Sequence, residues 1–258
     1  SLKDEIKKDL EDLKNDLNNN QNNQEKQDQD IDDTKDDINQ DVNKSNSASQ
    51  IGDSLQKDYL VTIIDLPGHG MSEEPKTAWQ LDDFVDMLKQ LLDELKIKKP
   101  ILIGHSFGGK LSLLYASRYP VEKLILFGSP FQKKIKKETA KMKLLKSLKK
   151  VPVLNQFEEY AKKHIGSRDY RNASPIMRQI LVNHVNCDIT EDIKKIQCPA
   201  IIIWGTNDAE VPLEDAYVLE SLLPDAAVIE YEGCTHYAYL EDLGRTVRII
   251  KNFLGSEQ

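Results

Sequence analysis

An apolar run that ends in a Gly-x-Ser-x-Gly turn constrains this chain more than any other feature. Residues 101–103 read Ile-Leu-Ile, residues 104–108 read Gly-His-Ser-Phe-Gly, and a helix-like pattern follows from Leu111. A strand, a tight turn and a helix in this order expose a nucleophilic serine at the end of a sheet. We expect glycine to be required at 104 and 108, because side chains beside Ser106 would clash in the crowded turn. The motif also recurs by chance, so the rest of the chain has to support it.

Beyond residue 58, the chain alternates apolar strand-like runs with helix-like segments. Strands are predicted at 59–64, 100–104, 122–128, 199–205 and 227–231. Helices are predicted at 78–95, directly after the turn at Ser106, at 213–222 and at 240–254. Short apolar runs rich in Ile, Leu and Val are typical of parallel strands that are buried on both faces. The alternation therefore predicts an α/β fold with a doubly wound, mostly parallel sheet.

Residues 131–196 interrupt this alternation. They begin with a lysine-rich helical segment between residues 133 and 150, and a second helical stretch is predicted at 168–181 around Pro175. A helical segment inserted between two strands predicts a lid, which leaves 58–130 and 197–258 as the core. The lysines are interpreted as a solvated outer face, with an anionic substrate or a membrane surface as the alternative.

Residues 1–57 differ from the rest in composition. They contain 15 acidic residues and 8 lysines, and they have no aromatic residue, proline or cysteine. Most of the formal net charge of −8 therefore lies in this segment. Leu10, Leu17, Ile31 and Ile38 share one heptad position, which predicts a helix or weak coiled coil; disorder is the alternative. A coil over residues 1–45 would allow self-association.

One carboxylate and one histidine follow strand ends at matching places. Asp208 follows the strand at 199–205, and His236 follows the strand at 227–231. Loops at the carboxyl ends of parallel strands meet at one edge of a sheet, so both side chains are expected near Ser106. A serine needs a base to remove its proton, and the base needs a carboxylate to fix its tautomer. Glu210 is a less suitable substitute for Asp208, because it lies beyond the turn.

The chain from about residue 58 onward resembles the lidded α/β-hydrolase superfamily. The matching motifs are Asp65-Leu-Pro-Gly-His-Gly70, Gly104-His-Ser-Phe-Gly-Gly109, Gly205-Thr-Asn-Asp208 and Gly233-Cys-Thr-His236. The resemblance implies Ser106 as nucleophile, His236 as general base and then acid, and Asp208 as the residue that orients it. It also implies the backbone N–H of Phe107 as one oxyanion donor.

Residues 1–57 do not match the strands that the family pattern places before Tyr59. One of those strands lies between the strands predicted at 59–64 and 100–104, and its His-Gly loop supplies the second oxyanion N–H. Three explanations are open: a truncated core joined to a coil, with a rearranged sheet; a coil within an oligomer that completes or abolishes the site; and a stretch whose residues, as given in the sequence, are not those that folded with the rest. A sheet without that strand is expected to expose unpaired backbone and apolar side chains.

The remaining candidate residues have structural interpretations. His69 and His105 are expected to pack in their turns, His164 and His184 to lie in the lid, and Cys234 to be a small packed residue. Tyr237 and Tyr239 either line the pocket or pack. The three cysteines have no metal-ligand spacing and favour a reduced, cytoplasmic setting. We expect no cofactor, metal, membrane span or nucleic-acid partner.

The function that these residues predict best is a serine hydrolase that cleaves a small carboxylic ester or related acyl bond through an acyl-enzyme. One alternative is a hydrolase-fold scaffold or oligomerising protein with weak or no activity. Another is a carbon–carbon bond hydrolase or lyase that uses the same triad.

Overall fold

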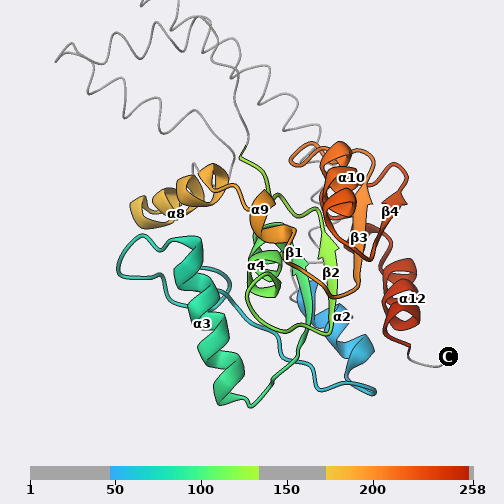
Figure 1. Cartoon of the computed structure of the whole chain (residues 1–258), viewed down its shortest axis with the longest axis horizontal. Helices are drawn as coiled ribbons and strands as arrows, with labels where there is room; N and C mark the ends of the chain where they lie inside the picture. Colours follow the sequence, from blue (N-terminus) through green and yellow to red (C-terminus); the bar gives the residue numbers. More distant parts are fainter. Residues whose placement is uncertain (1–46, 134–172, 256–258) are drawn as a thin grey trace, which may run out of the picture.

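The computed structural model describes residues 47–133 and 173–255 (Figure 1). The coil predicted for 1–45 and most of the predicted lid, including His164 and the lysine-rich segment, lie outside the described residues. Within the described ranges, no helix combines the length and the apolar character needed to cross a membrane.

A parallel sheet of four strands forms the centre of the described structure. The strands are β1 (Ile101–His105), β2 (Lys123–Phe127), β3 (Ala200–Gly205) and β4 (Ala226–Tyr231), and they pair in the order β1-β2-β3-β4. Each agrees with a predicted strand to within one or two residues. The doubly wound α/β class is thus confirmed.

The strands are mainly apolar because helices cover both faces of the sheet. Leu124 and Leu126 of β2 point into one core cluster, while Ile125 and Phe127 point into the other. This alternation follows from the two-residue period of a strand. It explains why the strands have no polar face in the sequence.

Helices cover each face of the sheet (Figure 1). The first core cluster receives α3 (Leu81–Glu94), α4 (Phe107–Ala116), α8 (Pro175–Asn186), α9 (Thr190–Ile193) and α10 (Leu213–Leu222). The second receives α2 (Ser47–Leu55), α11 (Ala238–Glu241) and α12 (Leu243–Leu254).

Local sequence signals explain where two of these helices begin. Helix α8 starts at Pro175 rather than running through it, and the hydroxyl of Ser174 accepts a hydrogen bond from the N–H of Met177. Proline suits the first turn of a helix because it lacks the N–H that would be unpaired there. The last predicted helix is divided at Asp242, whose side chain caps α12 by accepting from the N–H of Arg245.

The predicted strand at 59–64 is wrong. This segment is not part of the sheet, and its residues Leu60 and Ile63 are 89% and 44% exposed. Among the described strands β1 lies at the edge of the sheet, and its central residue, Ile103, is exposed as well. A β-branched run forms a strand only where a neighbour offers backbone groups to pair with. Among the described residues, none pairs with 60–64.

Measurements of stability test whether the 59–64 segment is exposed. Ile125→Ala should lower the free energy of unfolding by about 2–4 kcal/mol, because Ile125 is fully buried between β1 and β3. Leu60→Ala should change it by less than about 0.5 kcal/mol, because that side chain is solvated. Urea unfolding followed by circular dichroism measures both. A loss at Leu60 comparable to that at Ile125 would mean that the 59–64 run is buried after all.

Candidate active site

Ser106 occupies the tight turn between β1 and α4. Its backbone has φ 50° and ψ −114°, a conformation that non-glycine residues rarely adopt. Two hydrogen bonds hold it there: the N–H of Ser106 donates to the carbonyl of Phe127 (2.9 Å), and its carbonyl accepts from the N–H of Lys110 (3.1 Å). The serine is therefore fixed at the carboxyl end of the sheet, at the amino end of a helix.

Close packing of α4 against the sheet makes glycine necessary at two positions of the turn. A Cβ on Gly104 would lie 2.6 Å from the carbonyl oxygen of Gly108, and a Cβ on Gly109 would overlap the side chain of Ser129. Gly108 was predicted to be crowded in the same way, and this is wrong for the part of the chain that the structure describes, where a Cβ on Gly108 meets nothing within 4 Å. The spacing of the motif did not show that Gly109, and not Gly108, faces the sheet.

Asp208 and His236 form a buried hydrogen-bonded pair. Nδ1 of His236 donates to Oδ2 of Asp208 over 2.7 Å, and the two side chains are 5% and 1% exposed, respectively. The other carboxylate oxygen of Asp208 accepts from the backbone N–H groups of Glu210 (2.8 Å) and Val211 (2.9 Å). The carboxylate is thus oriented from both sides. It fixes the tautomer in which Nε2 of His236 carries the lone pair.

Gly128, at the end of β2, provides the space for this pair. It has φ 47°, and a Cβ built on it would lie 2.8 Å from Nδ1 of His236 and 3.3 Å from Oδ2 of Asp208. Sequence reasoning missed this residue. The only signal was a glycine directly after an apolar strand, as in the turn before Ser106.

The reactive face of His236 is not yet engaged with Ser106. Nε2 of His236 is buried and has no hydrogen-bond partner among residues 47–133 and 173–255, so the hydroxyl of Ser106 is not its partner in this conformation. A carboxylate oxygen of Glu210 lies 3.6 Å from Nε2. Glu210 therefore does not replace Asp208, which holds the opposite ring nitrogen. In unliganded enzymes, hydrogen bonds of this kind are often long and shorten only when substrate binds.

Phe107 is the first residue of α4, so its N–H has no intrahelical acceptor. This N–H and the amino end of the helix dipole suit a developing negative charge beside Ser106. The ring of Phe107 packs between His69 (centroids 5.8 Å apart) and His184 (4.7 Å).

The other histidines of the site have packing and positioning contacts. Nε2 of His105 donates to the backbone carbonyl of His236 (3.0 Å), and its ring packs against Tyr237 and Tyr239 (both 5.0 Å). Burial, with the neighbouring His236 second, lowers the pKa of His105 to about 4. Burial, with the charge of Lys110 second, lowers the pKa of His184 to about 3. Both rings are therefore neutral at pH 7.

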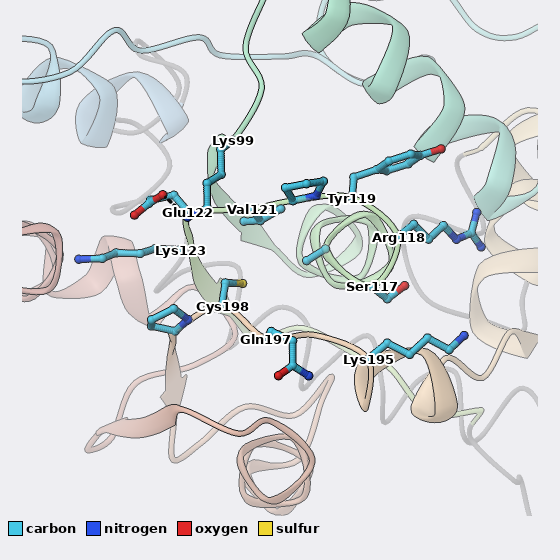
Figure 2. A pocket seen from close by; sticks show the side chains of 13 residues that line it. Lys99, Ser117, Arg118, Tyr119, Val121, Glu122, Lys123, Lys195, Gln197 and Cys198 are labelled. Carbon is cyan, nitrogen blue, oxygen red and sulfur yellow. Dashed lines mark ion pairs between the residues drawn. The ribbon is translucent and has the colours of Figure 1, made fainter.

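A hollow at the opposite end of the sheet is a weaker candidate for a site. It lies at the amino ends of β2 and β3, beside the last turn of α4 (Figure 2). Its cationic side chains are Lys99, Arg118, Lys123 and Lys195. Each already has a partner: Glu122, Asp82, the carbonyl of Phe253 and Asp192, respectively. The hollow therefore offers little unpaired charge to an anion.

Within residues 47–133 and 173–255, no group of three or more His, Cys, Asp or Glu side chains is arranged to hold a metal ion. The three cysteines are free thiols. Burial is the main cause that raises the pKa of the Cys234 thiol, which makes that thiol a poor nucleophile.

Comparison with known proteins agrees with this fold. Residues 42–146 match the family model described as the alpha/beta hydrolase fold. A proline iminopeptidase of Heyndrickxia coagulans is 28% identical, and the alignment covers 79% of this chain and 84% of the relative. A 2-hydroxy-6-oxononadienedioate/2-hydroxy-6-oxononatrienedioate hydrolase of Paraburkholderia phymatum is also 28% identical, with 76% and 77% covered.

Solved structures give the same result. The meta-cleavage product hydrolase CumD of Pseudomonas fluorescens IP01 has a TM-score of 0.61 at 24% identity, over 80% of this chain and 84% of that chain. An esterase from Thermogutta terrifontis has a TM-score of 0.59 at 18% identity, over 80% and 83%. These similarities show that the chain has the α/β-hydrolase fold.

Gly128→Ala tests whether the space at β2 is needed by the Asp208–His236 pair. The added methyl group would meet the imidazole and would also force alanine to a positive φ, so we expect a loss of about 2–4 kcal/mol in the free energy of unfolding. The low-field NMR signal of the hydrogen-bonded Nδ1 proton should also disappear. Gly244→Ala is the control, because a Cβ on this helical glycine meets only Arg248 at 3.9 Å. An unchanged NMR signal in Gly128→Ala would contradict this account.

Acid should destabilise the protein through His105 and His184. Their folded pKa values lie below the unfolded value of about 6.5, so the unfolded chain binds more protons as the pH falls. The contribution of each neutral histidine to the free energy of unfolding is therefore fully present above pH 6.5. It is lost as the pH falls toward 4 for His105 and toward 3 for His184. Between pH 7.5 and 5, each should cost roughly 1–2 kcal/mol.

Urea unfolding of His184→Phe at both pH values measures its share of that loss. We expect a smaller difference between pH 7.5 and 5 than in the wild type. His69→Gln, at an exposed histidine, serves as control and should leave the difference unchanged. If the free energy of unfolding of His184→Phe falls between pH 7.5 and 5 as much as that of the wild type, His184 does not contribute to the acid destabilisation.

Proposed function

We propose that the protein is a serine hydrolase that cleaves a small carboxylic ester or related acyl bond through an acyl-enzyme. The observation that carries the proposal is the 2.7 Å hydrogen bond between His236 and Asp208 at the sheet edge where Ser106 occupies a strained turn. The match of residues 42–146 to the family model of the alpha/beta hydrolase fold supports it.

The geometry supports a two-step reaction. Nε2 of His236 takes the proton of the Ser106 hydroxyl as Oγ attacks the acyl carbon, and the N–H of Phe107 donates to the oxyanion. The imidazolium, stabilised by Asp208, then gives that proton to the departing alkoxide, which leaves as an alcohol. In the second step His236 deprotonates a water molecule, whose oxygen attacks the acyl carbon. The bond from that carbon to Oγ breaks, the imidazolium returns the proton to Oγ of Ser106, and the acid leaves. Rotation of the Ser106 side chain or a shift of the imidazole brings Oγ and Nε2 within hydrogen-bonding distance when substrate binds.

Hydrolysis of a carbon–carbon bond is the second candidate. Its support is the similarity to relatives named for such substrates, including the 2-hydroxy-6-oxo-2,4-heptadienoate hydrolase of Pseudomonas putida at 25% identity. Loss of absorbance from 2-hydroxy-6-oxo-2,4-heptadienoate would favour it over p-nitrophenyl ester cleavage. The same nucleophile and base serve both reactions, so only turnover separates them.

Labelling with a fluorophosphonate probe tests the nucleophile directly. The wild-type protein should be labelled at Ser106, found by peptide mass spectrometry, because only an activated serine attacks the probe rapidly. Ser106→Ala should abolish the labelling and reduce p-nitrophenyl acetate turnover by at least about a thousandfold.

Ser117→Ala is the matched control on α4. The hydroxyl of Ser117 donates to the carbonyl of Leu114 and has no contact with His236, so labelling should persist. Folded wild-type protein that is neither labelled nor active on esters would rule out the hydrolase and leave the non-catalytic scaffold.

A further inference from the structure

Lys110 is a buried cation that the proposed reaction does not use. It lies on the first turn of α4, four residues after Ser106, and is 1% exposed. Its Nζ donates to the backbone carbonyls of His184 (2.8 Å) and Cys187 (2.6 Å). A buried ammonium is costly unless it is hydrogen-bonded. Here it is bonded to the end of a helix that is distant in the sequence.

The two acceptors belong to the carboxyl end of α8. His184 lies in its last turn and Cys187 is its C-cap residue. Carbonyls at the end of a helix lack intrahelical donors and carry the negative end of the helix dipole, so a cation is favoured there. The carbonyl of His184 also accepts a longer bond from the backbone N–H of Cys187 (3.3 Å), so a side chain without N–H groups at position 110 would remove the shorter bond at His184 and the ammonium bond at Cys187.

The charges around Lys110 are consistent with this contact. Burial lowers the pKa of Lys110 to about 8, and the nearby Cys187 and Asp188 act in the opposite direction. The side chain is therefore still mainly protonated at pH 7. The ring of His184 faces it in the neutral form, since Lys110 is one of the causes that lower the pKa of His184. The charged Lys110 and the neutral His184 are thus neighbours without electrostatic repulsion.

Helix α8 contacts both α4, which follows the turn at Ser106, and the loop that carries the Asp65-Leu-Pro-Gly-His-Gly70 motif. The side chain of Met177 packs against Gly68, and the amide of Asn183 donates to the carbonyl of Trp79 (3.1 Å). The ring of His184 packs edge-to-face on Phe107. The helix is thus a wall that contacts both the 65–79 loop and the residue that follows Ser106.

We propose that Lys110 is a positioning residue. Its ammonium binds the carboxyl end of α8 to α4 and so holds α8, as one side of the substrate-binding site, next to Ser106. Its backbone N–H bonds to the carbonyl of Ser106, and its side chain bonds to α8, so one residue connects the nucleophile turn to the wall. The role in substrate binding rests on the proposed hydrolase function. The fastening of α8 does not.

Lys110→Met tests both parts, because methionine fills similar space without N–H donors. Amide hydrogen exchange followed by mass spectrometry should be at least about tenfold faster in peptides of residues 176–188, with β1, β2 and β3 unchanged. KM for p-nitrophenyl butyrate should rise about tenfold while kcat changes less than about threefold, since the catalytic groups stay in place. Lys110→Arg, which keeps a cation with donors, should restore part of the KM.

Lys89→Met is the matched control, at a lysine on α3 whose ammonium pairs with Asp93. It should match the wild type in exchange and kinetics. Wild-type exchange at 176–188 in Lys110→Met would overturn the fastening, and an unchanged KM would overturn the role in binding. If Lys110→Met does not fold, Lys110→Gln decides by the same measurements, because its amide keeps N–H groups at a shorter reach.

Failure of the proposed function gives a different result. A wild-type protein that resists the fluorophosphonate and turns over no ester removes the substrate-binding role together with the hydrolase. The exchange experiment would then still decide whether Lys110 fastens α8.

Discussion

The close contact between helix α4 and the ends of β1 and β2 is the constraint on which the site depends. Backbone atoms of the turn at 104–109 touch, and Ser106 takes a positive φ because the chain has to reverse within that space. Strain of this kind persists only when the surroundings over-determine it. Here the hydrogen bond from Ser106 to Phe127 and the first bond of α4 supply that support.

The same edge of the sheet positions the base by different means. Asp208 binds Nδ1 of His236, and His105 donates to its backbone carbonyl. The absence of a side chain at Gly128 leaves room for the imidazole ring. Each of these groups follows the end of a strand or forms its last residue. The parallel sheet therefore brings together residues that are more than a hundred positions apart in the sequence.

Features that depend on local pattern could be predicted from the sequence. The four strands that pair were placed to within two residues, because apolar β-branched runs bounded by Gly and Pro carry a clear signal. The arrangement of Asp208 and His236 after neighbouring strands also predicted that they would meet. Whether they act on a substrate with Ser106 stays a prediction.

Features that depend on distant neighbours could not be predicted. The run at 59–64 has the composition of a strand, but strand pairing needs a partner that the pattern does not reveal. The roles of Gly109 and Gly128 depend on Ser129 and His236, which no spacing rule connects to them. Lys110 resembled any helix lysine, and only the structure shows the carbonyls that surround its ammonium.

The pairing of the strands also has a consequence for the order of folding. Ile101 pairs with Lys123, 22 positions later, and Ala200 pairs with Ala226, 26 positions later, whereas Leu124 pairs with Ala200 across 76 positions. Closing a longer loop costs more chain entropy before any contact compensates for it. The β1-α4-β2 and β3-α10-β4 units therefore form most readily as separate halves. We therefore expect docking of β2 against β3, which brings the turn at Ser106 and the Asp208–His236 pair together, to follow the formation of the two units.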